Sequence, residues 1–124
     1  MNVIETKNAP GAIGPYSQGY AFGDLVITSG QIPVDPATGT TPEGISAQAE
    51  QSCKNVGAIL EAAGSGFDKV VKTTCFLADM GDFAVMNEVY ASQFEGAFPA
   101  RSAVAVKTLP KNGLVEIEVI AMKE

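Results

Sequence analysis

Arg101 carries the most distinctive chemistry in this sequence, because it is the only arginine among eight basic side chains. It stands within residues 98–106, a segment that is otherwise almost wholly apolar. A guanidinium group is always charged, and its planar fork binds a carboxylate through two hydrogen bonds. Since an unpaired charge in apolar surroundings is costly, Arg101 needs an anionic partner. That partner is either an Asp or Glu elsewhere in the chain or the carboxylate of a small ligand.

Glu116 is the second candidate, because it lies in a segment that alternates apolar and acidic residues, Val115-Glu116-Ile117-Glu118-Val119-Ile120. Successive side chains of a strand point to opposite faces, so Glu116 and Glu118 share one face. For Glu118 the pattern is typical of the solvated face of an edge strand. For Glu116 a solvated position and a functional role are equally open interpretations.

The spacing between Arg101 and Glu116 limits how the two side chains could share a site. A tight hairpin at Asn112-Gly113 would place Glu116 opposite Leu109, about 26 Å along the strand from Arg101. One common site therefore requires either another strand between the last two or a contact between subunits. The sequence alone does not decide between these arrangements.

The residue types that are missing narrow the possible chemistry. The sequence contains no histidine, which excludes a Ser-His-Asp triad, a Cys-His dyad and imidazole metal ligands. It also contains no glycine-rich phosphate-binding motif. Acid–base chemistry must then come from carboxylates, Tyr, Lys, Cys or bound water. Cys53 and Cys75 are too few for a disulfide framework or a zinc site, and we interpret both as core thiols.

The overall composition favours a single domain spanning residues 1–124. The chain is 46% hydrophobic with a mean hydropathy of +0.15, which suggests that another subunit covers part of its surface. A net charge of −6 without a basic cluster argues against nucleic-acid binding. No apolar run is long enough to span a membrane, and no secretory signal is recognisable at the N-terminus. We therefore expect a cytoplasmic protein that does not contact membranes.

Local patterns predict an alternating α+β order. Apolar residues at helical spacing predict one helix from Ile45 that ends at Gly64 and a second helix from about Asp82. The three prolines and three glycines of residues 30–44 predict a loop. The remaining patterned segments predict strands, the first two joined as a hairpin at Gly23-Asp24: residues 19–22, 25–29, 69–79, 101–107 and 114–122.

Four tracts carry a resemblance to a known family. They are Ile13-Gly14-Pro15-Tyr16-Ser17-Gln18-Gly19, Thr28-Ser29-Gly30-Gln31-Ile32-Pro33, Pro99-Ala100-Arg101-Ser102 and Val115-Glu116-Ile117-Glu118. In this order and nearly without gaps, from about Asn8 to the C-terminus, they resemble the reactive intermediate deaminase family, RidA, formerly called YjgF. The Pro-Ala-Arg-Ser tract followed by Val-Glu-Ile is the most specific part of the resemblance.

The resemblance implies a fold and an assembly. The fold would be the chorismate-mutase-like α+β class, a mixed sheet with two helices packed on one face. The strand from Lys69 would lie between the last two strands, which removes the hairpin conflict. Family members are homotrimers with a cleft between each pair of subunits. They hydrolyse reactive 2-enamine and 2-imino acids, such as 2-aminoacrylate and 2-iminobutanoate, to 2-keto acids and ammonia, and they need no cofactor or metal.

The resemblance also implies roles for individual residues. The catalytic set would be Arg101 as the carboxylate clamp, Glu116 as the general base for water, and Tyr16 as a hydroxyl of the cleft. The remaining positions would contact the substrate: Ser29, Gly30, Asn87, Ser102 and Ala103. Read without the resemblance, Tyr16 is an ordinary amphipathic aromatic, Ser29 a strand end and Asn87 an exposed helix residue.

Two departures from the family and two other functions stay open. Ala103 stands where many members have Cys, which favours a water mechanism over a covalent one, and residues 94–98 form a shorter link than in many members. The protein could instead be a non-catalytic sensor of small carboxylates, which would keep Arg101 but not require Glu116. It could also be a single-strand ribonuclease or translation inhibitor, although the sequence shows neither a carboxylate cluster nor a basic groove.

Overall fold

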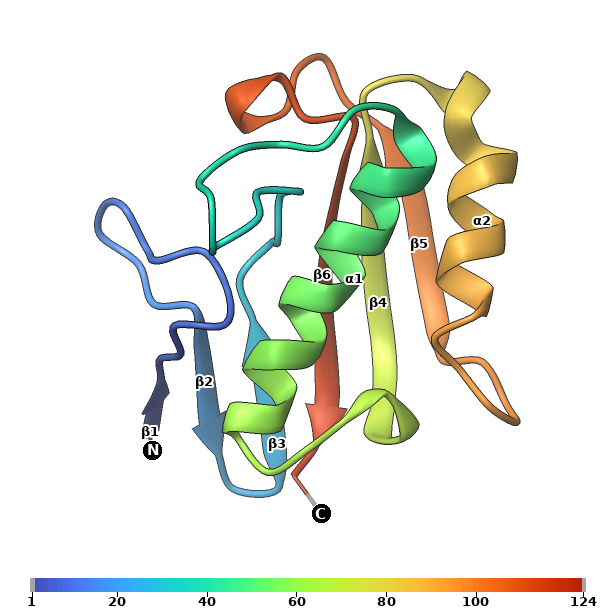
Figure 1. Ribbon diagram of the computed structural model, residues 1–124. Coiled ribbons are helices and arrows are strands. Elements are labelled where there is room, and N and C mark those ends of the chain that lie inside the picture. Colours follow the sequence, from blue (N-terminus) through green and yellow to red (C-terminus); the bar gives the residue numbers. More distant parts are fainter. Residues whose placement is uncertain (1, 124) are drawn as a thin grey trace.

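The computed structural model describes residues 2–123 of the chain as one six-stranded mixed sheet with its helices on one side (Figure 1). The strand order is β1-β2-β3-β6-β4-β5. The strands are β1 (Asn2–Ile4), β2 (Gly19–Phe22), β3 (Leu25–Thr28), β4 (Val70–Leu77), β5 (Ala100–Ala105) and β6 (Val115–Met122). Only β4 and β5 pair in parallel, and all other neighbours are antiparallel.

The position of β4 confirms that the last two strands do not form a hairpin. β4 lies between β5 and β6, with Thr73 opposite Arg101 on one side and Phe76 opposite Glu116 on the other. The chain leaves β5 and passes through a short 3₁₀ turn, Pro110–Asn112, before it enters β6. This is the α+β arrangement that the family resemblance implied.

Two α-helices cover one face of the sheet. They are α1 (Ile45–Ala62) and α2 (Phe83–Ala91), and Figure 1 shows α1 in front of β6 and β4 and α2 beside β5. Gly64 ends α1 as predicted, because its φ of 77° is favourable only for glycine and lets the N–H of Ser65 reach the carbonyl of Leu60. No helix in the described part of the chain has both the length and the hydropathy needed to cross a bilayer.

The core lies between this face and the helices. Val56, Ile59 and Leu60 of α1 are completely buried, and they pack in one cluster with the inward residues of the strands, such as Val26 and Val115. The strands alternate accordingly, with odd-numbered residues of β6 buried and even-numbered residues facing the other side. The sheet therefore has one helix-covered face and one helix-free face.

Most predicted elements are confirmed, with three differences. The hairpin of β2 and β3 forms, with Phe22 paired to Leu25 around the turn. β1 was missed, because three residues are too few to show an alternation. The strand predicted over residues 69–79 is shorter, since 3₁₀ turns Phe67–Lys69 and Met80–Asp82 flank it. β6 is an interior strand, so the edge-strand interpretation of Glu118 was wrong.

Candidate functional site

Three residues of α2 hold the guanidinium group of Arg101. Nη1 donates a 2.6 Å hydrogen bond to Oδ1 of Asn87. Cζ lies over two aromatic rings, 4.7 Å from the centroid of Tyr90 and 5.3 Å from that of Phe83. Positions 83, 87 and 90 follow the i, i+4, i+7 spacing of one helical face, so a single face of α2 provides all three contacts. We call Phe83, Asn87 and Tyr90 the Arg101 cradle.

The Arg101 cradle contains no negative charge. Among residues 2–123 the one ion pair joins Lys69 to Asp68, at 3.4 Å, and no carboxylate pairs with Arg101. The structural ion pair that the sequence left open is thus not found in the described part of the chain. Arg101 is half-exposed, so its remaining N–H donors can reach an anion that the chain itself does not supply.

The carboxylate of Glu116 lies directly on the backbone of Gly30. A methyl group added at Gly30 would overlap Oε2 of Glu116 and lie 2.7 Å from its Cδ. Two backbone hydrogen bonds between Gln31 and Ile117, of 2.8 and 3.2 Å, fix this approach. A residue larger than glycine at position 30 would therefore displace the Glu116 carboxylate from this place, a consequence that the sequence did not indicate.

The environment of Glu116 raises the pKa of its carboxyl group. The main cause is partial burial, which disfavours the charged form, and repulsion from Glu118 acts in the same direction. No hydrogen bond to the Glu116 carboxylate occurs among residues 2–123 that would counter this. A carboxylate with a raised pKa is a stronger base than an exposed one, which suits proton abstraction from water.

Tyr16 and Ser29 line the same cleft as Glu116. The N–H of Ser29 donates to the carbonyl of Gln18 at 2.8 Å, and its hydroxyl donates to the carbonyl of Ser17, so residues 17–18 are tied to Ser29. An open cleft of about 1380 Å³ runs over this region, and its lining includes Tyr16, Ser29, Gly30, Glu116 and Glu118. The structure thus brings four of the predicted site residues together, with Glu118 as a fifth side chain that we had assigned to solvent.

Arg101 and Glu116 lie on opposite faces of the sheet. Thr73, the partner of Arg101 in β4, is buried under the helices, whereas Phe76, the partner of Glu116, belongs to the helix-free face. The register separates the two residues by about 10 Å along the strands and about 10 Å across them. One chain therefore cannot place both side chains around one small ligand.

Ala103 and Ser102, two further predicted substrate contacts, also lie on opposite faces of the sheet. Ala103 shares the helix-covered face with Arg101 and pairs with Cys75 of β4. Ser102 points to the helix-free face, where its hydroxyl accepts a 3.0 Å hydrogen bond from Nζ of Lys72. The Ser102 side chain is thus directed away from the face that Arg101 occupies in the same chain, and its contact with the substrate stays a prediction.

Both cysteines are core thiols, as predicted. Cys53 is 2% exposed and Cys75 is completely buried. Burial raises the pKa of Cys53 to about 12, and it raises the pKa of Cys75 to about 11 although Arg101 acts in the opposite direction. Both thiols stay protonated at neutral pH, and a protonated thiol is a poor nucleophile.

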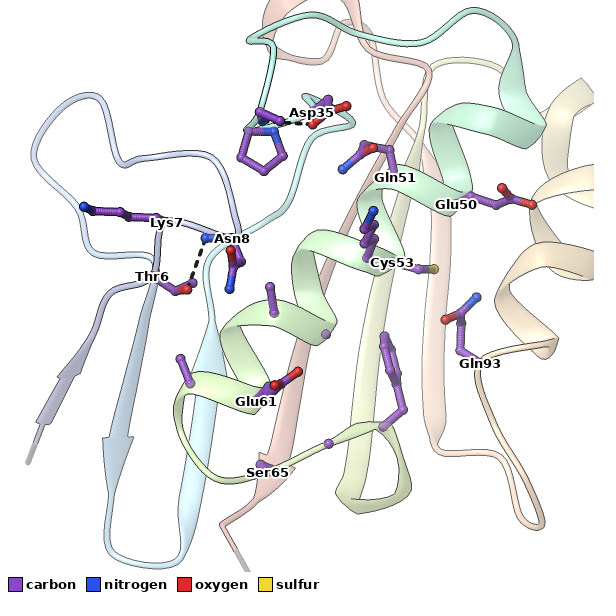
Figure 2. Close-up of a pocket in the computed structure, with 18 residues that line it drawn as sticks. Thr6, Lys7, Asn8, Asp35, Glu50, Gln51, Cys53, Glu61, Ser65 and Gln93 are labelled. Atoms are coloured by element: carbon purple, nitrogen blue, oxygen red, sulfur yellow. Dashed lines mark hydrogen bonds between the residues drawn. The ribbon is translucent and has the colours of Figure 1, made fainter.

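A second hollow, of about 900 Å³, contains none of the predicted site residues. Figure 2 shows it between the N-terminal segment, α1 and the loop at Asp35, with side chains of both charges around it. The labelled side chains that line it include Lys7, Glu50 and Glu61. Its short hydrogen bonds join neighbouring residues, such as the 2.9 Å bond from the N–H of Ala37 to Asp35.

Comparison with known proteins extends the resemblance over the whole chain. Residues 6–123 match the family described as Endoribonuclease L-PSP. A 2-iminobutanoate/2-iminopropanoate deaminase from Salmonella typhimurium is 55% identical, over 97% of this chain and 96% of the relative. The deaminase of the same name from Mus musculus is 49% identical, over 98% of this chain and 90% of the relative.

Solved structures agree with the sequence comparison. The structure of TdcF from E. coli with bound serine superimposes with a TM-score of 0.97 at 48% identity, covering 100% of both chains. The YjgF gene product from E. coli superimposes equally well, with a TM-score of 0.97 at 51% identity over 100% of both chains. The chain therefore belongs to the RidA/YjgF family, the family whose sequence model is described as Endoribonuclease L-PSP.

Proposed function

We propose that this protein hydrolyses small 2-imino acids to 2-keto acids and ammonia, as a 2-iminobutanoate/2-iminopropanoate deaminase. Curated relatives that are 49–55% identical over nearly the whole chain carry this name. The structural observation that carries the proposal is the guanidinium of Arg101, which is held by neutral groups and exposed to an incoming anion. A 2-imino acid supplies that anion as its carboxylate.

Arg101 would bind the substrate carboxylate through two parallel hydrogen bonds. Asn87 keeps the group in place through Nη1 and competes little for the ligand, because it has no charge. Ala103, on the same face of β5, would border the small side chain of the substrate.

Glu116 would activate the water that attacks the imine carbon. In this step the carboxylate takes a proton from water while the oxygen bonds to the carbon of the protonated imine, which gives a tetrahedral carbinolamine. Glu116 then returns the proton to the nitrogen. As the C–N bond breaks, the carbinolamine hydroxyl loses its proton to the Glu116 carboxylate, which leaves the 2-keto acid and ammonia, and the departing ammonia takes up that proton to leave as ammonium. Tyr16 and Ser29 would orient the water and the intermediate from the same cleft. Because Gly30 has no side chain, the Glu116 carboxylate can lie against the backbone at this position.

The complete site would form between subunits of a homotrimer. Arg101 of one subunit and Glu116 of its neighbour would meet there, since the sheet separates the two residues within a chain. The helix-free face supports an assembly, because five apolar side chains on it are 37–46% exposed: Phe22, Ile27, Val104, Ile120 and Met122. Covering such a surface is the ordinary role of a subunit contact.

The proposal includes no cofactor, no membrane contact and no nucleic-acid partner. Buried free thiols fit the reducing cytoplasm, which remains our prediction for the location. The family description names an endoribonuclease, but the curated relatives named above are deaminases, which favours imine hydrolysis over nuclease activity.

The test couples this protein to a threonine dehydratase, which releases the imine, and follows loss of the imine signal. Spontaneous hydrolysis is itself fast, so it is measured without the protein and subtracted. We expect the signal to decay faster in proportion to the concentration of the protein. A protein that binds 2-ketobutyrate but never accelerates the decay would be a carboxylate sensor instead.

A further inference from the structure

Among the three contacts of the Arg101 guanidinium, those with Asn87 and Tyr90 have different consequences. The hydrogen bond to Asn87 fixes the position of Nη1 but leaves the group free to rotate about that bond. The ring of Tyr90, 4.7 Å from Cζ, restricts this rotation, because the flat cation is attracted to the face of the ring. The direction in which the free N–H donors point therefore depends on where the Tyr90 ring lies.

The Tyr90 ring is itself fixed by a buried hydrogen bond. Its hydroxyl group shares a 2.7 Å bond with Oγ1 of Thr73, and the two residues are only 6% and 1% exposed. The ring of Phe94 packs against Tyr90 at a centroid distance of 4.9 Å. A buried hydroxyl pair of this kind has no competing water, so it holds the ring in one orientation.

Thr73 is also the residue opposite Arg101 in the parallel pair of β4 and β5. The contacts thus run from Arg101 to Tyr90 of α2, from Tyr90 to Thr73 of β4, and from Thr73 back to Arg101 through strand pairing. This closed arrangement attaches α2 to the sheet at the level of the guanidinium group.

We propose that Tyr90 and Thr73 are positioning residues: their hydrogen bond fixes the orientation of the Arg101 fork and thereby sets the affinity of the site for a carboxylate. The inference deepens the proposed function, because it concerns the same anion receptor. Neither residue touches the ligand or the reacting atoms. Their effect is confined to substrate binding, whereas the attack of water depends on Glu116, which the neighbouring subunit would supply.

The single arginine makes this inference directly measurable. The ¹⁵N spectrum of the protein contains one arginine Nε–H signal, which needs no assignment by mutation. Its order parameter reports how rigidly the guanidinium is held, and the measurement uses the ligand-free protein. It therefore does not depend on whether the protein hydrolyses imines.

Three variants separate positioning from packing. Tyr90→Phe keeps the ring and removes its hydroxyl, Thr73→Val removes the other hydroxyl at nearly constant volume, and Thr73→Ser retains a hydroxyl. The matched control is Thr28→Val, which removes another buried threonine hydroxyl, one that accepts a 3.1 Å hydrogen bond from the N–H of Val119. It lies in β3, two strands away from β4.

We expect Tyr90→Phe and Thr73→Val each to lower the order parameter of the Arg101 Nε–H and to weaken 2-ketobutyrate binding about three- to tenfold. KM for the imine should rise by the same factor with kcat nearly unchanged. Thr73→Ser should restore most of the parental affinity, and the double variant should bind no more weakly than either single variant. Thr28→Val should leave the order parameter of the Arg101 Nε–H at its parental value.

The possible results distinguish this inference from the proposed function. Unchanged order parameter and unchanged affinity in Tyr90→Phe would overturn the positioning role, even if the parent is an active deaminase. A parent without imine hydrolysis would instead overturn the proposed function, while the order parameter still decides about Tyr90. If Thr73→Val does not fold, Tyr90→Phe and Thr73→Ser carry the comparison.

Discussion

At the scale of single residues, Arg101 and Glu116 differ in when they act. Arg101 meets the carboxylate in both the bound substrate and the transition state, so its loss removes binding as well as turnover. Glu116 acts while water attacks, so its loss affects mainly the chemical step. Substitution of the two residues should therefore change different kinetic constants.

Replacing Arg101 by Ala should abolish binding of 2-ketobutyrate and imine hydrolysis, and Arg101→Lys should not restore them, because an ammonium group lacks the fork.

Glu116→Gln keeps the size and polarity but cannot take a proton, so kcat should fall by roughly 10²–10⁴-fold with ligand affinity little changed. Calorimetric titration and the coupled assay measure the two effects. The control is Lys107→Ala, which removes an exposed cation near the end of β5. A Glu116→Gln variant with the parental rate would contradict the assignment of the general base.

Gly30 should matter through Glu116. In Gly30→Ala the added methyl group would occupy the position of the Glu116 carboxylate, so the side chain must move away from the cleft. We expect kcat to fall about 10²-fold, approaching Glu116→Gln, while 2-ketobutyrate still binds. Gly11→Ala is the matched control, since a methyl group at Gly11 would meet no atom within 4 Å. Equal kcat values for Gly30→Ala and the parent would show that catalysis does not depend on the position of the Glu116 carboxylate against the backbone of Gly30.

At the scale of the element, β6 places Glu116 and Glu118 two residues apart on one face. Partial burial and the charge of Glu118 both raise the pKa of Glu116. The base is active only when it is deprotonated, so activity should fall as pH decreases through this raised pKa. A raised carboxyl pKa means that the folded state binds the proton more tightly than the unfolded state. The contribution of Glu116 to the free energy of unfolding should therefore increase as pH decreases, whereas activity falls.

Glu118→Gln should therefore move the acid limb of the pH–rate profile to lower pH. The substitution removes the repulsion, and the pKa of Glu116 falls while the effect of burial remains. The measurement is the pH dependence of kcat/KM, supported by NMR titration of the Glu116 carboxyl carbon. Glu61→Gln, an exposed change on α1, should leave both profiles unchanged. A shift of the acid limb toward higher pH in Glu118→Gln would contradict the like-charge account.

At the scale of the whole molecule, two inactive variants should restore each other. If Arg101 and Glu116 of different subunits form each site, a trimer mixed from Arg101→Ala and Glu116→Gln subunits contains some sites with both native residues. Random assortment at equal amounts gives about a quarter of the sites intact. Co-refolding of the two variants, followed by the coupled assay, measures this fraction, and each variant refolded alone is the control.

The same experiment tests the assembly itself. Light scattering should give a mass near three times 12.8 kDa at micromolar concentration. A monomer under these conditions, or a mixture with no recovered activity although both variants form trimers, would contradict a site shared between subunits.

The sequence determined what depends on local pattern and on residue chemistry. The periodicity of apolar residues predicted α1, α2 and all strands except β1, because burial of one face imposes the same spacing wherever an element packs. The charge of Arg101 in an apolar segment predicted a carboxylate partner, either within the chain or in a ligand. The alternation in β6 placed Glu116 and Glu118 on one face before their surroundings were known.

Only the tertiary structure decided which distant segments meet. The insertion of β4 between β5 and β6 puts Arg101 and Glu116 on opposite faces, and no local pattern encodes this register. The contact of Gly30 with Glu116 and the bond between Tyr90 and Thr73 join residues far apart in the chain. Such pairings follow from how helices and strands fill one shared core, so they become visible only when the whole chain has folded.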